Sequence, residues 1–126
     1  MAAIAVGLTE RLEVVVTDGD TAARLGSGDL AVLATPRLIA LMEAAALRAV
    51  APCLDDGQTT VGSAVSVEHL KPTAVGGRIE VEARLTAVDG RRLSFELCAT
   101  ENGQTVGRGE HVRYIVDAQR FMEKLK

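Results

Sequence analysis

A single carboxylate interrupts a long apolar stretch, and its type and position suit it for chemistry. The stretch Thr35 to Val50 is rich in Ala, Leu and Met, which favour a helix, and Glu43 lies in its middle. A helix that is apolar on nearly all sides is normally buried. Because an ionised carboxylate is costly there unless it is paired, two interpretations stand. Glu43 is a catalytic carboxylate, or it reaches solvent or pairs with Arg37 or Arg48.

The start of this helix is marked by Thr35 and Pro36. A threonine hydroxyl can cap a first-turn amide, and proline suits the first helical position. Thr35 is therefore either a plain cap or a catalytic hydroxyl. Helix geometry separates it from Glu43 by about 12 Å of axial rise, too far for direct contact within one chain. We expect Glu43 of one subunit to meet Thr35 of a second subunit, or the two to flank a substrate from opposite ends.

The elements that must position these residues are mostly strands. Downstream of the helix, alternation of apolar and polar residues predicts strands over 59–70, 78–89, 91–101 and 104–116, with hairpin turns at Asp89-Gly90 and Asn102-Gly103. In the first of these strands, His69 and Gly62 are expected on opposite faces. Upstream, we expect a strand over 8–17, a turn over 18–20 and a short second strand over 21–25. A short helix is expected over 117–125.

One buried helix against an antiparallel sheet is an α+β arrangement. The 126 residues predict one domain, 1–126. The net charge of −3 without a Lys/Arg block argues against nucleic acid, as does the 2% aromatic content. We expect no membrane span, no signal peptide and a cytoplasmic location. The two cysteines and two histidines lack metal-ligand spacing, so no metal or cofactor is expected. Open sheet edges favour dimerisation.

Several segments occur in the order and spacing of a known family. They are Val32-Leu33-Ala34-Thr35, Leu41-Met42-Glu43, Arg48-Ala49-Val50-Ala51-Pro52, Gly62, Val67-Glu68-His69 and Val88-Asp89-Gly90-Arg91-Arg92-Leu93-Ser94. Together they resemble the fluoroacetyl-CoA thioesterase family from Val32 to the C-terminus, with no single motif diagnostic. The resemblance implies a hotdog fold, an antiparallel sheet wrapped around a central helix, working as a homodimer or a tetramer. It also implies that Thr35, Glu43 and His69 are catalytic.

The resemblance associates Gly62 with the acyl and water site. The amides after Thr35, beside Pro36, offer a positive helix end for an oxyanion. His111 has no matched role and is interpreted as structural. Four arginines are interpreted as solvated surface charges, with contact to CoA phosphates as the alternative: Arg48, Arg91, Arg92 and Arg113.

The function implied is hydrolysis of a short- or medium-chain acyl-CoA, with Glu43 activating water or attacking the thioester. The segment Thr21 to Leu33 is short, Gly-rich and free of aromatic residues, unlike the aromatic lid of the fluoroacetyl-specific enzyme. Fluoroacetyl selectivity therefore does not follow from the resemblance. Two alternatives remain, a non-catalytic acyl-CoA-binding module and an enoyl-thioester hydratase. A binder has no need of a carboxylate near a thioester, and no Asp-His pair supports a hydratase.

Overall fold

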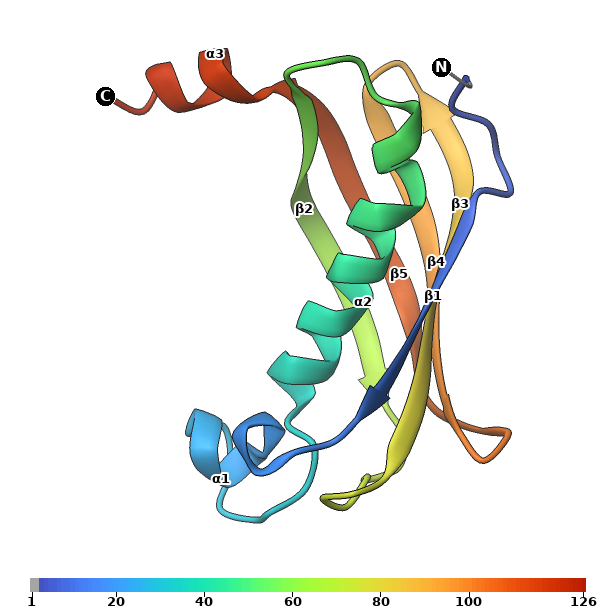
Figure 1. The fold of residues 1–126 in the computed structure, drawn as a ribbon, viewed down its shortest axis with the longest axis vertical. Helices are drawn as coiled ribbons and strands as arrows, with labels where there is room; N and C mark the ends of the chain where they lie inside the picture. The colour runs from blue at the N-terminus through green and yellow to red at the C-terminus, as the bar shows by residue number, and fades with distance from the viewer. Residues whose placement is uncertain (1–2) are drawn as a thin grey trace.

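The computed structural model describes residues 3–126, in which one long helix lies across a curved five-stranded sheet (Figure 1). In chain order the elements are β1 (Thr9–Val15), the 3-10 helix η1 (Asp18–Asp20), α1 (Ala22–Leu25), α2 (Thr35–Val50), the 3-10 helix η2 (Ala51–Cys53), β2 (Gln58–His69), β3 (Arg78–Asp89), β4 (Arg92–Glu101), β5 (Gln104–Asp117) and α3 (Ala118–Glu123). The α+β arrangement and the central helix are as predicted.

The sheet is antiparallel throughout, with the strand order β1-β3-β4-β5-β2. Two hairpins connect β3 to β4 and β4 to β5, as predicted. Their turns need left-handed backbone, which Gly90, Asn102 and Gly103 adopt with φ of 61°, 51° and 77°. Within this chain, β1 and β2 are the two edges of the sheet.

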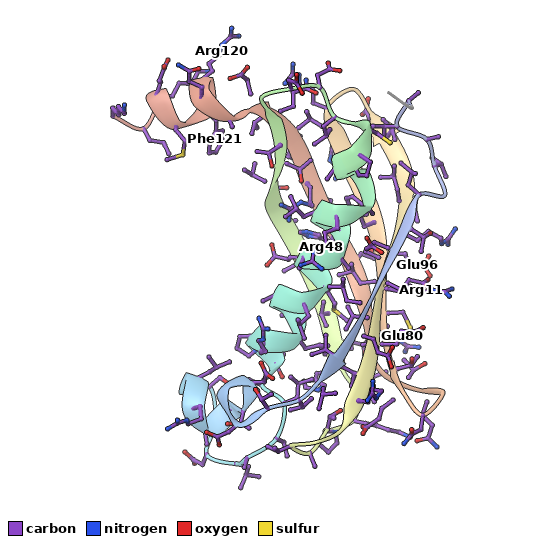
Figure 2. The ribbon with its side chains drawn as sticks, in the orientation of Figure 1. Arg11, Arg48, Glu80, Glu96, Arg120 and Phe121 are labelled. Atoms are coloured by element: carbon purple, nitrogen blue, oxygen red, sulfur yellow. The ribbon has the colours of Figure 1, made fainter. Side chains whose placement is uncertain are left out.

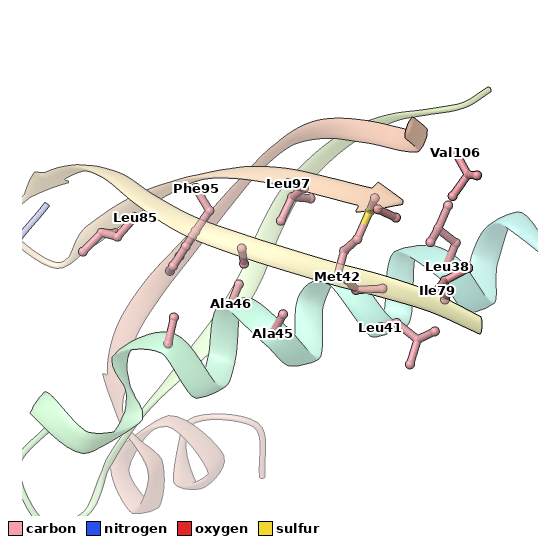
Figure 3. Close-up of a cluster of buried hydrophobic side chains, with 14 of the residues drawn as sticks. Leu38, Leu41, Met42, Ala45, Ala46, Ile79, Leu85, Phe95, Leu97 and Val106 are labelled. Atoms are coloured by element: carbon pink, nitrogen blue, oxygen red, sulfur yellow. The ribbon is translucent and has the colours of Figure 1, made fainter. Parts of the chain in front are cut away.

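The core lies between α2 and the concave face of the sheet (Figure 3). Met42, Ala45 and Ala46 of the helix are fully buried, as are Leu85 and Phe95 of the sheet. The alternation predicted for β3 and β4 puts their apolar residues on this face. On the convex face, charged residues pair across strands instead, for example Arg11 with Glu82 at 2.6 Å. The sheet therefore has one apolar face and one solvated face.

Three sequence-based expectations were wrong in detail. In place of the short strand expected over 21–25, residues 22–25 form the short helix α1, which the Thr21 hydroxyl caps at its start and the left-handed Gly26 ends. The N-cap of α2 is Ala34 with no side-chain cap, so Thr35 and Pro36 are its first two residues. Finally, α2 is not buried all round: Pro36 and Ala40 are exposed on its outer side, where Leu47 is half-buried.

Among residues 3–126, no helix is long and apolar enough to cross a membrane.

Candidate active site

The first half of the site joins the start of α2 to the end of β2. The Thr35 hydroxyl Oγ1 lies 2.8 Å from Nδ1 of His69, at the last residue of the strand. Since this hydroxyl bonds the ring and no amide of α2, the cap interpretation of Thr35 was wrong. Burial lowers the pKa of His69, so the imidazole is neutral at pH 7. Thr35 and His69 form a neutral polar pair.

This pair opens into a small apolar pocket of about 310 Å³. Pro36, Val32 and Leu70 line it together with Thr35 and His69. The Nε2 atom of His69 is buried and has no hydrogen-bond partner within the described chain. A buried polar nitrogen without a partner is costly, so this atom is available to a group that enters from outside.

The second half of the site surrounds Glu43, midway along α2. Its Oε2 atom lies 3.6 Å from Nη1 of Arg113 and 4.0 Å from Nε2 of His111, both on β5. The Glu43 side chain is 40% exposed, whereas that of Arg113 is 8% exposed. The Glu43 carboxylate is therefore partly exposed to solvent and lies against the buried Arg113 guanidinium. It pairs with neither Arg48, which is exposed, nor Arg37, which bonds Asp20 at 2.8 Å.

Hydrogen bonds to Thr60 and His111 hold the Arg113 guanidinium in place. Its Nε donates to the Thr60 hydroxyl at 2.8 Å and its Nη2 donates to the Thr60 carbonyl at 2.9 Å. Its Nη1 lies 3.2 Å from Nε2 of His111. A guanidinium only donates, so Nε2 of His111 must be the acceptor. The other nitrogen, Nδ1, lies 2.7 Å from the Ala64 carbonyl and so carries the proton.

These bonds fix His111 as a neutral ring in one tautomer. Burial lowers the pKa of His111, and the nearby Arg113 charge lowers it further. Burial also lowers the pKa of Arg113, while the Glu43 carboxylate opposes that shift. The interpretation of Arg113 as a solvated surface charge was therefore wrong, and His111 belongs to the candidate site. The sequence feature that could have grouped His111 with Arg113 is their spacing of two residues on β5, which places both side chains on one face of the strand.

Gly62 faces this cluster. A Cβ built on Gly62 would lie 2.7 Å from Oε2 of Glu43, 3.2 Å from the His111 ring and 3.3 Å from Nη1 of Arg113. Real Cβ atoms do not approach so closely, so only glycine leaves the carboxylate in this position. The sequence pattern singled out Gly62, and the structure brings it to Glu43 rather than to Thr35.

A β-bulge corrects the predicted faces of β2. The register against β5 shifts between Gly62 and Ala64, which inserts one residue and reverses the alternation. Gly62 opposes the buried Arg113 before the bulge, and Val65 opposes the buried His111 after it. Gly62 and His69 therefore share the concave face, contrary to the strict alternation expected from the sequence.

The two halves do not meet within one protomer. Thr35 and Glu43 are eight residues apart on α2, and Gly62 and His69 are seven apart on β2, about 23 Å of strand. The structure thus confirms that Thr35 and Glu43 are not in direct contact in one chain. A larger hollow of about 870 Å³ lies on the convex face of the sheet, and neither Thr35 nor Glu43 lines it.

The residues described here contain no group of three or more His, Cys, Asp or Glu side chains that could hold a metal ion.

The architecture defines the class of protein. The structure matches a hot-dog-like protein from Thermanaerovibrio acidaminovorans with a TM-score of 0.87 at 21% identity, over 95% of this chain and 89% of that one. It also matches a thioesterase superfamily member from Thermus thermophilus with a TM-score of 0.90 at 28% identity, over 99% and 93% of the two chains. The fold is the hotdog fold of thioesterases.

The comparisons then narrow the class to one family. A family model described as fluoroacetyl-CoA-specific thioesterase matches residues 16–119. The fluoroacetyl-CoA thioesterase of Streptantibioticus cattleyicolor is 37% identical over 95 residues, covering 75% of this chain and 68% of the relative. A solved structure of the fluoroacetyl-CoA thioesterase FlK superposes with a TM-score of 0.91 at 32% identity, over 98% and 96% of the two chains. This chain belongs to the fluoroacetyl-CoA-specific thioesterase family, as the sequence resemblance predicted.

Proposed function

We propose that this protein hydrolyses acyl-CoA thioesters to a carboxylic acid and CoA. The observation that carries the proposal is the Glu43 carboxylate, half-exposed on a buried Arg113–His111 pair and facing Gly62, in a member of a thioesterase family. The relatives are thioesterases, which favours hydrolysis over a binding module or an enoyl-thioester hydratase.

Each residue of the candidate site can be assigned a part in the hydrolysis. Glu43 takes the proton of a water that attacks the carbonyl carbon, and the C–S bond then breaks to give the carboxylic acid and the CoA thiolate. Alternatively Glu43 attacks that carbon itself and expels the CoA thiolate, and water then hydrolyses the resulting anhydride to the carboxylic acid and free Glu43. Arg113, itself oriented by Thr60 and His111, holds the carboxylate in position. Thr35 and His69 contact the acyl group or the leaving sulfur, and the first turn of α2 beside Pro36 stabilises an oxyanion, with the Gly62 amide as a second donor.

A homodimer is the working unit in this proposal. The edge strand β2 leaves a row of backbone groups unpaired, and its residues from Gly62 to Ser66 are all exposed. Antiparallel pairing of two copies of β2 about this stretch brings the start of one strand to the end of the other. Glu43 and Gly62 of one protomer then approach Thr35 and His69 of its partner. Such pairing unites two half-sites that a single chain keeps apart.

The substrate class is a short- or medium-chain acyl-CoA. The pocket at Thr35 is lined by aliphatic residues such as Val32 and Leu70 and by no Phe, Tyr or Trp. A short or medium aliphatic acyl group accounts for this lining without a contact to fluorine.

We propose the cytoplasm as the compartment. Cys53 and Cys98 are free thiols, as is usual in the reducing cytoplasm. No cofactor enters the reaction, because hydrolysis needs only the substrate and water.

The test is thiol release from acetyl-, fluoroacetyl-, butyryl-, hexanoyl- and phenylacetyl-CoA. We expect the wild type to release thiol from at least one of them. Glu43→Gln should lower kcat/KM by about 10²- to 10⁴-fold, the usual contribution of a general base, with the melting temperature retained. Glu68→Gln, at an exposed carboxylate on the opposite face of β2, is the matched control and should keep full activity. Equal activity of wild type and Glu43→Gln would contradict the assignment of Glu43.

A further inference from the structure

The C-terminal helix α3 leaves much of its apolar surface uncovered by the described residues of its own protomer. Phe121, Met122 and Leu125 are 38%, 58% and 70% exposed. Figure 2 shows Phe121 on a helix that extends away from the sheet and from α2, with Arg120 on the other side of the helix. Large apolar side chains gathered on one exposed element usually mark an interaction surface.

The position of α3 decides what lies opposite these side chains. Asp117, at the end of β5, pairs with Gln58 at the start of β2, and the Ala118 amide donates to the Gly57 carbonyl at 2.9 Å. The helix is thus tied to the beginning of the edge strand and continues past it (Figure 1). Whatever covers the β2 edge also comes next to α3.

In the homodimer of the proposed function, the beginning of β2 lies against the end of the partner's β2. That end carries His69 and the pocket it shares with Thr35. The lining of this pocket is mostly apolar, and Leu70, which belongs to it, is 44% exposed. Leu30, whose carbonyl accepts from the Ala23 amide next to the lining residue Ala22, is 70% exposed. Two apolar surfaces without partners in one chain therefore come together across the two-fold axis.

The charges agree with this contact. The residues 118–126 carry Arg120, Lys124 and Lys126 against one acidic residue, Glu123. The residues 17–34, which contribute Val32 and Leu33 to the pocket, carry the reverse bias: Asp18, Asp20 and Asp29 against Arg24. Asp18 pairs with Arg24 at 2.9 Å and Asp20 pairs with Arg37 at 2.8 Å, so Asp29 is the carboxylate of this segment outside an ion pair within the described residues. Opposite net charge favours association of these two segments from different subunits and disfavours either with itself.

We propose that α3 docks on the partner subunit and that Phe121 and Met122 close the outer side of the partner's Thr35–His69 pocket. The inference rests on the proposed homodimer. It gives each acyl pocket an aromatic side chain from the other subunit, where the pocket's own wall has none. Acyl recognition is then shared between both chains, as the catalytic residues are.

The protein contains no tryptophan, so Phe121→Trp introduces a single fluorescent reporter on this surface. Gln119→Trp is the matched control, because two residues along a helix point to opposite sides. At a concentration where the chain sediments as a dimer, the indole of Phe121→Trp should emit at shorter wavelength and be quenched severalfold less by acrylamide than that of Gln119→Trp. Equal quenching, or a monomer in sedimentation, overturns the proposal.

A second substitution identifies the surface that covers the indole. Leu70→Ser, added to Phe121→Trp, should raise acrylamide quenching towards that of Gln119→Trp. Within one protomer Leu70 lies at the far end of the strand from α3, about 40 Å away along β2, so such an effect must cross between subunits. Unchanged quenching with the dimer intact shows that α3 does not contact this rim and overturns the proposal.

Kinetics separate this proposal from the proposed function. Phe121→Ser should raise KM for the preferred acyl-CoA severalfold while the protein remains a dimer, and Gln119→Ser should leave KM unchanged. A wild-type KM for Phe121→Ser contradicts closure of the pocket. If the wild type hydrolyses no acyl-CoA, the proposed function fails, and the fluorescence measurements still decide whether α3 docks on the partner.

Discussion

The two halves of the candidate site differ in charge and in how they are held. Glu43 faces a buried guanidinium that is fixed by two bonds to Thr60 and one to His111. Thr35 and His69 are neutral partners joined by one bond, beside an apolar pocket. The charged half is suited to activating a nucleophile, and the neutral half to receiving an acyl group. In the proposed homodimer, each half supplies what the other lacks.

Gly62→Ala tests the charged half, and its expected effect on activity is larger than that of the other substitutions considered below. The added methyl group would lie 2.7 Å from Glu43 Oε2, the free end of a flexible side chain, so the carboxylate should move while the fold is retained. We expect kcat to fall by about 10²-fold, because misplacing a catalytic group by about 1 Å has that cost. Gly19→Ala is the control, since its methyl group would lie 3.9 Å from the nearest atom.

The comparison would be weakened if Gly62→Ala kept wild-type kcat with an unchanged melting temperature. Glu43 would then not need its observed position.

Arg113→Leu tests the rigidity of the charged half. It removes two buried hydrogen bonds to Thr60 and leaves the Glu43 carboxylate without its cation. We expect the free energy of unfolding to fall by about 2–3 kcal/mol, measured by urea denaturation, because unpaired buried polar groups are costly. Arg92→Leu, at an exposed arginine on β4, should change it by less than about 0.5 kcal/mol. Similar losses of unfolding free energy in both variants would mean that Arg113 contributes no more to stability than an exposed arginine does.

Thr35→Ala tests the neutral half. The hydroxyl contacts His69 rather than an amide of α2, so stability should fall by less than the roughly 1 kcal/mol lost with a helix cap. Activity should fall about tenfold, the equivalent of one hydrogen bond of about 1.4 kcal/mol. Thr35→Ser keeps the hydroxyl and should retain most of the wild-type activity. A loss of stability without loss of activity would return Thr35 to a purely structural role.

The smallest effect is expected from pH. Burial lowers the pKa of both His69 and His111 on folding, so the unfolded chain binds protons more readily than the folded protein. Their contribution to stability is complete above the unfolded pKa of about 6.5 and is lost as pH falls below it. The melting temperature should therefore be lower at pH 5 than at pH 7.5, and His111→Gln should reduce that difference. An equal difference in wild type and variant would contradict the contribution of His111.

The sequence predicted the fold well because the fold depends on local signals. The apolar run from Thr35 and the alternation over 78–89 each require burial of one face, and the Asp-Gly and Asn-Gly turns fix how the strands connect. Glu43 was also found from sequence, as the charge that an apolar helix could not explain. The catalytic roles of Thr35 and Glu43 remain predictions that the substitutions above test, and that of His69 also remains a prediction.

Other features of the site were decided by tertiary structure. No local signal marks the bulge after Gly62, which depends on how β2 meets β5 and which brings Gly62 and His69 to the same face. A surface arginine and a buried one look alike in sequence, and only packing against Thr60 and Glu43 gave Arg113 its role. The partner of Thr35 lies 34 residues away, because a hydroxyl can donate or accept and so bonds whichever polar group the fold brings near. The sequence by itself determined which faces of β3 and β4 are buried, because their alternation is regular, and the tertiary structure determined the faces of β2 and which polar groups meet.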